Sequence, residues 1–162
     1  MNGATIVQLA PDQWHIFREL QLSMAREEEF LYPGSFVQEC QIVESAWQAR
    51  LADGAHPLLF AKEGDRYLGM IGARSVSLII ARIVSLYIMP SERRKGIASV
   101  LLEALLRELV QKGYAKVELR VHPQAHAACA LYRQFGFKER NSVTMITQYG
   151  TIVQLVFERY LV

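Results

Sequence analysis

The sequence lacks the features that would commit a protein of this size to a metal, a disulfide framework or a membrane. Its 162 residues include only two cysteines, Cys40 and Cys129, with no C-x-x-C pair and no histidine at ligand spacing beside them. No apolar run approaches the ~18 residues needed to span a bilayer, and the N-terminus has no signal-peptide pattern. We therefore expect a reduced, cytoplasmic protein without a metal or a membrane partner.

An excess of one charge is also missing. The formal net charge is +2, with 21% charged and 51% hydrophobic residues, which is the composition of an ordinary globular protein. This weak charge argues against a dedicated nucleic-acid binder. The nucleotide-binding patterns G-x-x-x-x-G-K-[ST] and G-x-G-x-x-G do not occur. The length suits one core, so residues 1–162 are assigned to a single domain.

Hydrophobic periodicity and turn residues predict a mixed α/β chain. Strands are expected at 5–9, 58–62, 67–76, 82–89, 117–121, 141–147 and 151–160, and helices at 11–26, 42–52, 97–112 and 125–135. Acids, aromatics, proline and glycine follow one another in residues 27–36, which predicts an irregular connection. The order of elements predicts an α/β (α+β) fold, a mixed sheet of about seven strands with helices on both faces. The C-terminal strands favour a homodimer.

The segment from the strand ending at Pro90 to the helix beginning near Ile97 is the most informative. Arg93, Arg94 and Lys95 crowd the start of this helix, where the macrodipole disfavours cations. A bound anion would reverse that argument, because amide groups, dipole and cations would then act together. Gly96 has no Cβ and would let the backbone approach a phosphate. The alternative is a solvated basic turn.

Two segments carry a family resemblance. Arg93-x-x-Gly96-x-Ala98 resembles the Gln/Arg-x-x-Gly-x-Gly/Ala acyl-CoA pyrophosphate loop of the GNAT superfamily of N-acetyltransferases, and the segment Leu131 to Phe137 resembles its Leu-Tyr-x-x-x-Gly-Phe signature. The resemblance covers the chain from about residue 67 to its end. It implies a GNAT acyl-CoA N-acyltransferase fold, whose fourth and fifth strands splay apart, and transfer of an acetyl group from acetyl-CoA to a primary amine. The implied donor-binding residues are Ile88, Met89, Arg93, Arg94, Lys95, Gly96, Ile97, Ala98 and Ser99.

Such a reaction needs a base for the protonated amine and an acid for the departing thiolate. The resemblance makes Tyr132 the general acid. The acids that some family members carry on the fourth and fifth strands are missing, since Arg82 and Arg120 stand near those positions. Glu118 and His122 share a strand face with Arg120, and either is a candidate base. They could equally be ordinary exposed polar residues, with a water acting as the base.

Other positions leave the acceptor and the activity open. Ala125 stands where many members carry an asparagine that binds the pantetheine arm, and Gln124 could replace it. Glu27, Glu28 and Glu29 are either a solvated charge run or a site for a cationic acceptor. The acceptor is a small-molecule or peptide amine of unidentified structure. The alternative functions are a non-catalytic acyl-CoA-binding or regulatory module and, less well supported, a nucleic-acid-binding domain.

Overall fold

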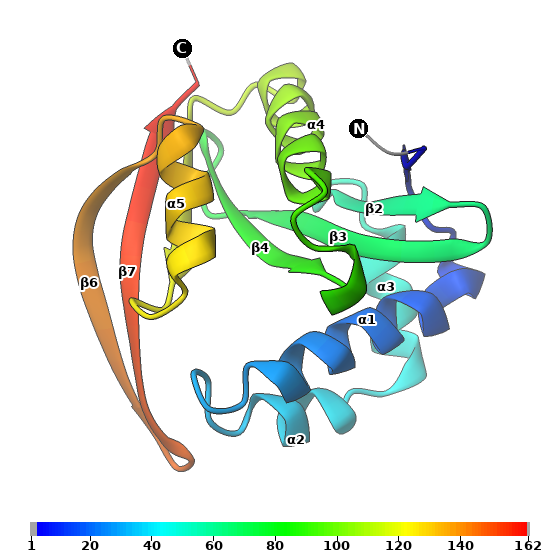
Figure 1. The fold of residues 1–162 in the computed structure, drawn as a ribbon, viewed down its shortest axis with the longest axis horizontal. Coiled ribbons are helices and arrows are strands. Elements are labelled where there is room, and N and C mark those ends of the chain that lie inside the picture. The colour runs from blue at the N-terminus through cyan, green and yellow to red at the C-terminus, as the bar shows by residue number, and fades with distance from the viewer. Residues whose placement is uncertain (1–2, 162) are drawn as a thin grey trace.

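The computed structural model describes residues 3–161 and contains one mixed sheet of seven strands in the order β1-β2-β3-β4-β5-β7-β6 (Figure 1). Only β4 and β5 pair in parallel, and the other neighbours are antiparallel. The strands are β1 Thr5–Val7, β2 Leu58–Glu63, β3 Arg66–Ser75, β4 Ile80–Ile88, β5 Lys116–Val121, β6 Lys138–Thr147 and β7 Gly150–Tyr160.

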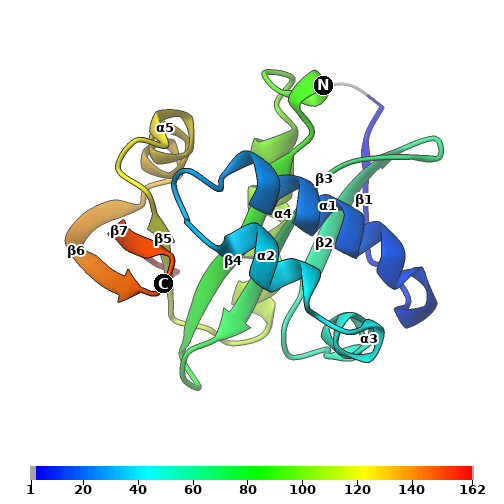
Figure 2. The ribbon, with the colours of Figure 1, turned by 90° about the horizontal axis from the view of Figure 1, so that it is seen from below.

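Helices cover both faces of this sheet (Figures 1 and 2). They are α1 Trp14–Glu27, α2 Ser35–Cys40, α3 Glu44–Ala52, α4 Ile97–Gln111 and α5 His126–Gln134, with 3-10 turns at Pro11–Gln13 and Pro90–Glu92. α4 and α5 pack on one face, while α1 and α3 pack on the other. The predicted mixed sheet with helices on both faces is therefore confirmed.

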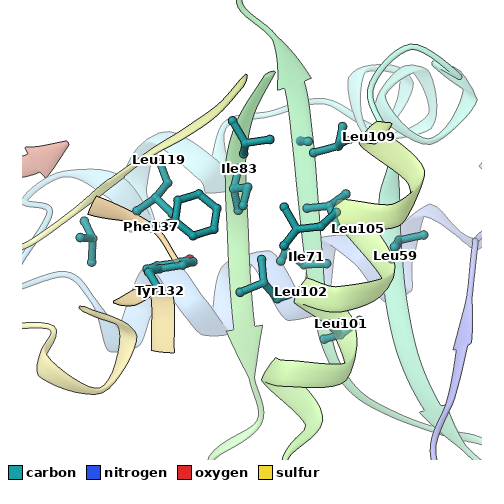
Figure 3. Close-up of a cluster of buried hydrophobic side chains, with 14 of the residues drawn as sticks. Leu59, Ile71, Ile83, Leu101, Leu102, Leu105, Leu109, Leu119, Tyr132 and Phe137 are labelled. Atoms are coloured by element: carbon teal, nitrogen blue, oxygen red, sulfur yellow. The ribbon is translucent and has the colours of Figure 1, made fainter. Parts of the chain in front are cut away.

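The larger hydrophobic core joins the two halves of the sheet beneath α4 and α5. Figure 3 shows Leu102 of α4 and Ile83 of β4 on one side, with Leu119 of β5 and Phe137 on the other. Tyr132 of α5 belongs to this core and meets the Phe137 ring edge-on, at a centroid distance of 5.7 Å. The apolar positions of the helical repeat predicted for α4 therefore face the sheet.

The parallel pairing of β4 with β5 is short. It runs from the pair Ile80 and Lys116 to the pair Ile83 and Leu119, although β4 continues to Ile88. Beyond Ile83, only β3 pairs with β4 among the described strands. A register shift between β3 and β4 and the positive φ of 58° at Ser85 mark a bulge in β4 at this point. The two central strands thus separate, as the resemblance implies.

The prediction of an irregular connection over residues 27–36 is wrong at its C-terminal end, because α2 begins at Ser35. The Glu29 carboxylate accepts hydrogen bonds from the amides of Gly34 (3.0 Å) and Phe36 (3.3 Å), and it thereby caps this six-residue helix. Periodicity cannot reveal so short a helix, since it completes fewer than two turns. A turn closed by the amide of Val76 and the carbonyl of Ile80 precedes β4, which begins two residues before the predicted Arg82.

Candidate active site

The basic loop ends at a helix N-terminus whose amides are unused within the helix. Gly96 is the N-cap of α4 with a φ of 84°, and no side chain caps the helix. The first helical hydrogen bond of α4 runs from the amide of Val100 to the carbonyl of Gly96 (3.2 Å). The three preceding amides, at residues 97–99, therefore have no intrahelical partner. Together with the dipole and the exposed Arg94, they can hold an anion.

Arg93 is used inside the protein. Its Nε donates to the carbonyl of Ile88 (2.9 Å), and its guanidinium pairs with Glu27 (2.7 Å) while lying 5.6 Å from the centre of the Tyr87 ring. The side chain therefore ties the basic loop to the end of α1 and to the end of β4. A direct contact of this side chain with a donor phosphate stays a prediction.

The main-chain groups predicted to bind the donor at the end of β4 already have partners. The amide of Met89 donates to the carbonyl of Leu68 (2.8 Å), and the carbonyl of Met89 accepts from the amide of Glu92 (2.8 Å). The Ile88 carbonyl accepts from Arg93. The unpaired edge of β4 therefore lies earlier, over residues 84–87, after the pairing with β5 ends.

A first expected result follows from the contacts of Arg93. Replacing Arg93 with Ala should lower the free energy of unfolding by about 1–2 kcal/mol, mostly through loss of the charged hydrogen bond to the Ile88 carbonyl. The half-exposed pair with Glu27 adds little. The matched control is Arg94→Ala, which removes a neighbouring exposed cation that has no ion pair among residues 3–161. Equal stability of the two variants in urea unfolding would contradict the assignment.

The three consecutive acids after α1 have different surroundings. Glu27 binds Arg93, whose hydrogen bond lowers the pKa of the Glu27 carboxyl. Glu29 caps α2. Burial, and then the nearby charge of Glu27, raise the pKa of the Glu28 carboxyl to about 7, against a smaller opposing effect of Arg93. Glu28 is thus the one member of this run whose carboxyl is free of a capping or ion-pair role.

Two tyrosines from different elements lie near Glu28. The Tyr32 hydroxyl accepts a hydrogen bond from the amide of His122 at the end of β5 (3.0 Å), and the two rings meet edge-on at 6.1 Å. Tyr132 is only 5% exposed. Burial raises the pKa of the Tyr132 phenol well above its usual range, and the Tyr32 and Glu28 charges add to this effect. We call Glu28, Tyr32 and Tyr132 the carboxyl–tyrosine cluster.

The Tyr132 hydroxyl has no hydrogen-bond partner among residues 3–161. Its oxygen is not one of the fully buried unpaired atoms of this part of the chain, so a bound group can reach it. A protonated phenol at this place can therefore donate its proton to a bound group. This agrees with the predicted role of Tyr132 as an acid, which stays a prediction.

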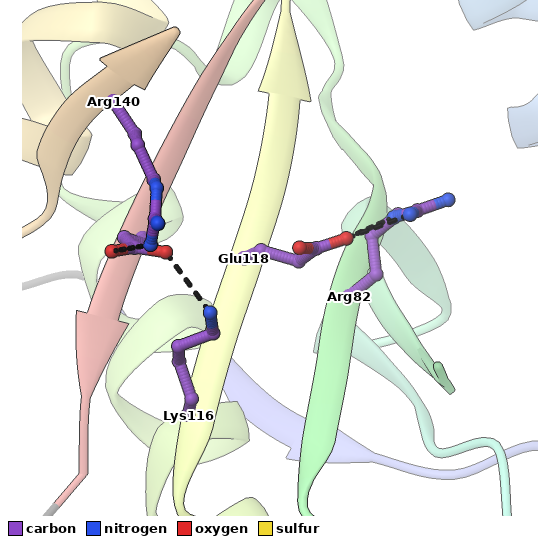
Figure 4. A network of polar contacts seen from close by, with 5 residues as sticks. Arg82, Lys116, Glu118 and Arg140 are labelled. Carbon is purple, nitrogen blue, oxygen red and sulfur yellow. Dashed lines mark hydrogen bonds and ion pairs between the residues drawn. The ribbon is translucent and has the colours of Figure 1, made fainter. Parts of the chain in front are cut away.

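The two predicted bases are less available than Glu28. Glu118 forms a two-pronged contact with Arg82, with its Oε1 2.8 Å from Nε and 2.7 Å from Nη2 (Figure 4). His122 accepts a hydrogen bond at Nδ1 from the amide of Gln124 (3.1 Å), so this amide closes a local turn. Base roles for Glu118 and His122, and a donor contact for Gln124, stay predictions.

Sequence reasoning missed Tyr32 and gave Glu28 only a charge-attracting role. Tyr32 and His122 are separated by 90 residues, and nothing in a run of three acids shows which one has its pKa raised. The only available signal was the repeated aromatic and acidic character of residues 27–36.

Two cavities differ in where they lie relative to this region. The larger, about 750 Å³, is lined by the C-terminal half of α4, by the end of α5 with the turn after it, and by the end of β7, and it lies at the opposite end of α4 from Gly96. The smaller, about 440 Å³, reaches β4 at Val84 and Ser85 and is otherwise lined by α1, α2, α3, β2, β3 and the connection between α3 and β2. Neither includes Tyr132, so cavity volume alone does not mark the site.

Two further findings concern residues 3–161. This part of the chain contains no group of three or more His, Cys, Asp or Glu side chains placed to hold a metal ion. Nor does it contain a helix with the length and apolar character needed to cross a membrane.

A sheet that opens between parallel central strands, with a basic loop and a helix N-terminus at the opening, defines the GNAT class of fold. The sequence model of the acetyltransferase (GNAT) family matches residues 17–137 of this chain. The chain therefore belongs to the GNAT family and is an N-acetyltransferase by class.

Relatives of known name agree with this class. The chain is 29% identical over 109 residues to a [ribosomal protein bS18]-alanine N-acetyltransferase of Salmonella typhimurium, a match covering 59% of this chain and 74% of that protein. The protein of the same name from Escherichia coli K12 is 32% identical over 89 residues, which cover 49% of this chain and 60% of that protein.

Solved structures share the fold over nearly the whole chain. A GNAT acetyltransferase from Streptococcus pneumoniae has a TM-score of 0.82 at 15% identity, covering 97% of this chain and 99% of that chain. PaiA N-acetyltransferase of Thermoplasma acidophilum, solved with coenzyme A, has a TM-score of 0.78 at 17% identity, covering 98% and 99%. At these identities, the likeness shows the fold alone.

Proposed function

We propose that the protein transfers the acetyl group of acetyl-CoA to a primary amine by direct attack. The observation that carries the proposal is the convergence of three features at the opening between β4 and β5. These are the unpaired edge of β4, the free amides of α4 and the carboxyl–tyrosine cluster. The donor pyrophosphate would lie on the amides of residues 94–99, and the pantetheine arm would follow the unpaired edge. Coenzyme A in the Thermoplasma structure supports this choice of donor.

The cluster supplies both proton transfers. The Glu28 carboxylate takes a proton from the substrate ammonium, and the neutral nitrogen attacks the thioester carbonyl carbon. The C–S bond of the resulting tetrahedral intermediate then breaks, and the coenzyme A sulfur receives the Tyr132 proton. A carboxyl with a pKa of about 7 is suited to act as a base near neutral pH. A phenol whose pKa is raised keeps its proton until a thiolate forms.

A direct test measures thiol release from acetyl-CoA in the presence of a panel of amines. Release that depends on an amine, together with a mass increase of 42 Da on that amine, as an acetyl group adds, is the expected result. Donor binding without transfer to any amine would instead favour the non-catalytic acyl-CoA-binding module. Arg82 and Arg120, at positions where other members carry acids, are the observation that favours this second function.

Glu28→Gln should reduce kcat/KM by about 10²-fold or more, the effect expected from loss of a general base. In the wild-type protein, kcat/KM should fall as the pH drops through about 7, because Glu28 must be ionised to accept a proton. The variant should lose this dependence. Glu29→Gln is the matched control, since it removes an adjacent carboxylate with a structural partner and should keep the wild-type midpoint. Glu27→Gln should instead lower the midpoint, because the Glu27 charge helps to raise the pKa of the Glu28 carboxyl. A pH dependence that persists unchanged in Glu28→Gln would exclude Glu28 as the base.

The same Glu28→Gln substitution should stabilise the protein at pH 8. The folded state holds the Glu28 proton up to a pH of about 7, whereas the unfolded chain releases it near 4.5. The free energy of unfolding therefore falls as the pH rises between these values, and the loss is complete above 7. Glutamine does not ionise, so the free energy of unfolding of the variant should exceed that of the wild type by on the order of 2 kcal/mol at pH 8 and should equal it near pH 4. Urea unfolding at both pH values measures this difference.

A further inference from the structure

Arg120 is a cation on β5 that has no hydrogen-bond or ion-pair partner among residues 3–161. It lies on β5 between Glu118 and His122, on the face opposite the core residues of that strand. Its Nε is buried and makes no hydrogen bond, and none of residues 3–161 forms an ion pair with its guanidinium. A buried donor left unpaired costs free energy, so an arginine held in this state is matched to a group from outside the chain.

The acids that β5 and β7 place on the same face as Arg120 already bind cations. Glu118 is committed to Arg82, and both side chains are 17% exposed. Directly opposite Glu118, Glu158 of β7 binds Lys116 at 3.1 Å and Arg140 at 2.8 Å (Figure 4). These carboxylates thus have their own cations, and Arg120 contributes a net positive charge to this face of the sheet.

The register of the sheet relates Arg120 to the carboxyl–tyrosine cluster through His122, whose amide contacts Tyr32. Arg120 and His122 lie two residues apart on the same strand face, a separation of about 7 Å. The amide of His122 binds the Tyr32 hydroxyl, and the Gln154 side chain of β7 lies near the same hydroxyl. An acceptor whose amine reaches Glu28 can therefore extend toward Arg120 along β5.

The α1–α2 connection and the β6–β7 hairpin meet over this side of the molecule. The Tyr149 ring lies so close to Gly34 that a Cβ there would overlap it. A Cβ at Gly150 would lie 3.4 Å from the Pro33 ring. These contacts join the two segments at neighbouring points and so obstruct a polypeptide that would pass between them.

We propose that the acceptor is a small amine that carries a carboxylate, and that Arg120 binds this carboxylate while the amine faces Glu28. The proposal rests on the proposed acetyl transfer and specifies its substrate class. Arginine binds carboxylates through paired N–H donors, so Arg120 discriminates by charge and by geometry.

The test measures binding rather than turnover, so that it does not depend on catalysis. Amino carboxylates are titrated by calorimetry into protein saturated with coenzyme A. The probes are the ω-amino acids from glycine to 6-aminohexanoate and the L-α-amino acids, each beside its carboxamide and the alkylamine of equal length. We expect at least one amino carboxylate to bind about tenfold or more tightly than its carboxamide.

Arg120→Gln should raise the Kd of that amino carboxylate by about 10- to 100-fold and leave the carboxamide unchanged. Arg120→Lys, which keeps the charge, should lose less, and it provides a second variant if the glutamine protein does not fold. Arg140→Gln is the matched control, because it removes an arginine of the neighbouring pair with Glu158 and should bind as the wild type does. Arg120→Glu should reverse the preference toward diamines.

Three outcomes would overturn the proposal. They are equal affinity for carboxylate and carboxamide throughout the series, equal loss of both in Arg120→Gln, and tight binding confined to a short peptide with an acidic N-terminal residue, titrated beside the same panel. Thiol-release assays on the same panel distinguish failure of the proposed substrate class from failure of the proposed transfer reaction. Equal acetylation of carboxylates and carboxamides would remove only the substrate class, whereas Arg120-dependent binding without thiol release would remove only the transfer reaction.

Discussion

Gly96→Glu is expected to abolish the stabilisation of the protein by acetyl-CoA. In the wild-type protein, ligand at about 100 times its Kd should add about 2.7 kcal/mol, a rise in Tm of roughly 5–10 °C. The substitution places a carboxylate beside the free amides of α4, where it repels phosphate and competes for the same donors. Thermal unfolding with and without acetyl-CoA measures the effect.

Gly113→Glu is an unusually close control for this experiment. Gly113 follows the other end of α4 with a φ of 89°, and a Cβ at either glycine would meet no atom within 4 Å. Both variants therefore carry a similar backbone cost of about 1–3 kcal/mol for a left-handed residue. Only Gly96→Glu should lose the response to ligand. An equal response to acetyl-CoA in the two variants would show that the donor does not bind at this loop.

Tyr132→Phe is expected to lower kcat by about 10²- to 10⁴-fold and to leave the KM for acetyl-CoA near its wild-type value. Phenylalanine keeps the ring that packs on Phe137 but removes the proton that the thiolate would receive. Because the ring remains, the loss appears in the chemical step rather than in folding. Steady-state kinetics with a saturating acceptor, together with a Tm measurement, separates these effects.

Tyr67→Phe provides the comparison, since it removes a phenol from β3 whose ring faces Lys62 rather than the opening. This variant should keep the wild-type kcat. Retention of more than a third of the wild-type kcat by Tyr132→Phe would show that another group protonates the thiolate, and Tyr32 of the same cluster would be the next substitution.

The C-terminal half of the fold was predictable because its signals are local. α4 has a continuous apolar repeat between Gly96 and Gly113, and β5 alternates strictly, so each element is specified by its own residues. α2 has no such signal. Its start depends on Glu29, whose carboxylate reaches forward to two amides after the intervening turn.

The site was predictable only where a motif carried it. Gly96 and Tyr132 stand in segments that resemble family signatures, whereas the surroundings of Glu28 arise from contacts between distant parts of the chain. The partners of Arg93 and Glu118 lie 66 and 36 residues away from them in the sequence. Such pairings depend on strand register and helix placement, which local patterns do not encode.

The early end of the pairing between β4 and β5 gives the sheet two additional edges in its interior. Unpaired strand edges ordinarily invite other chains to add a strand, which leads to aggregation. Here the exposed stretch of β4 is short, bulged at Ser85 and flanked by helices on both faces of the sheet. A broad β-strand from another protein cannot reach it, whereas a narrow chain with alternating amide donors and acceptors can. The fold therefore has an unpaired strand edge at the centre of its sheet, and the shape of the surroundings restricts which molecules can pair with that edge.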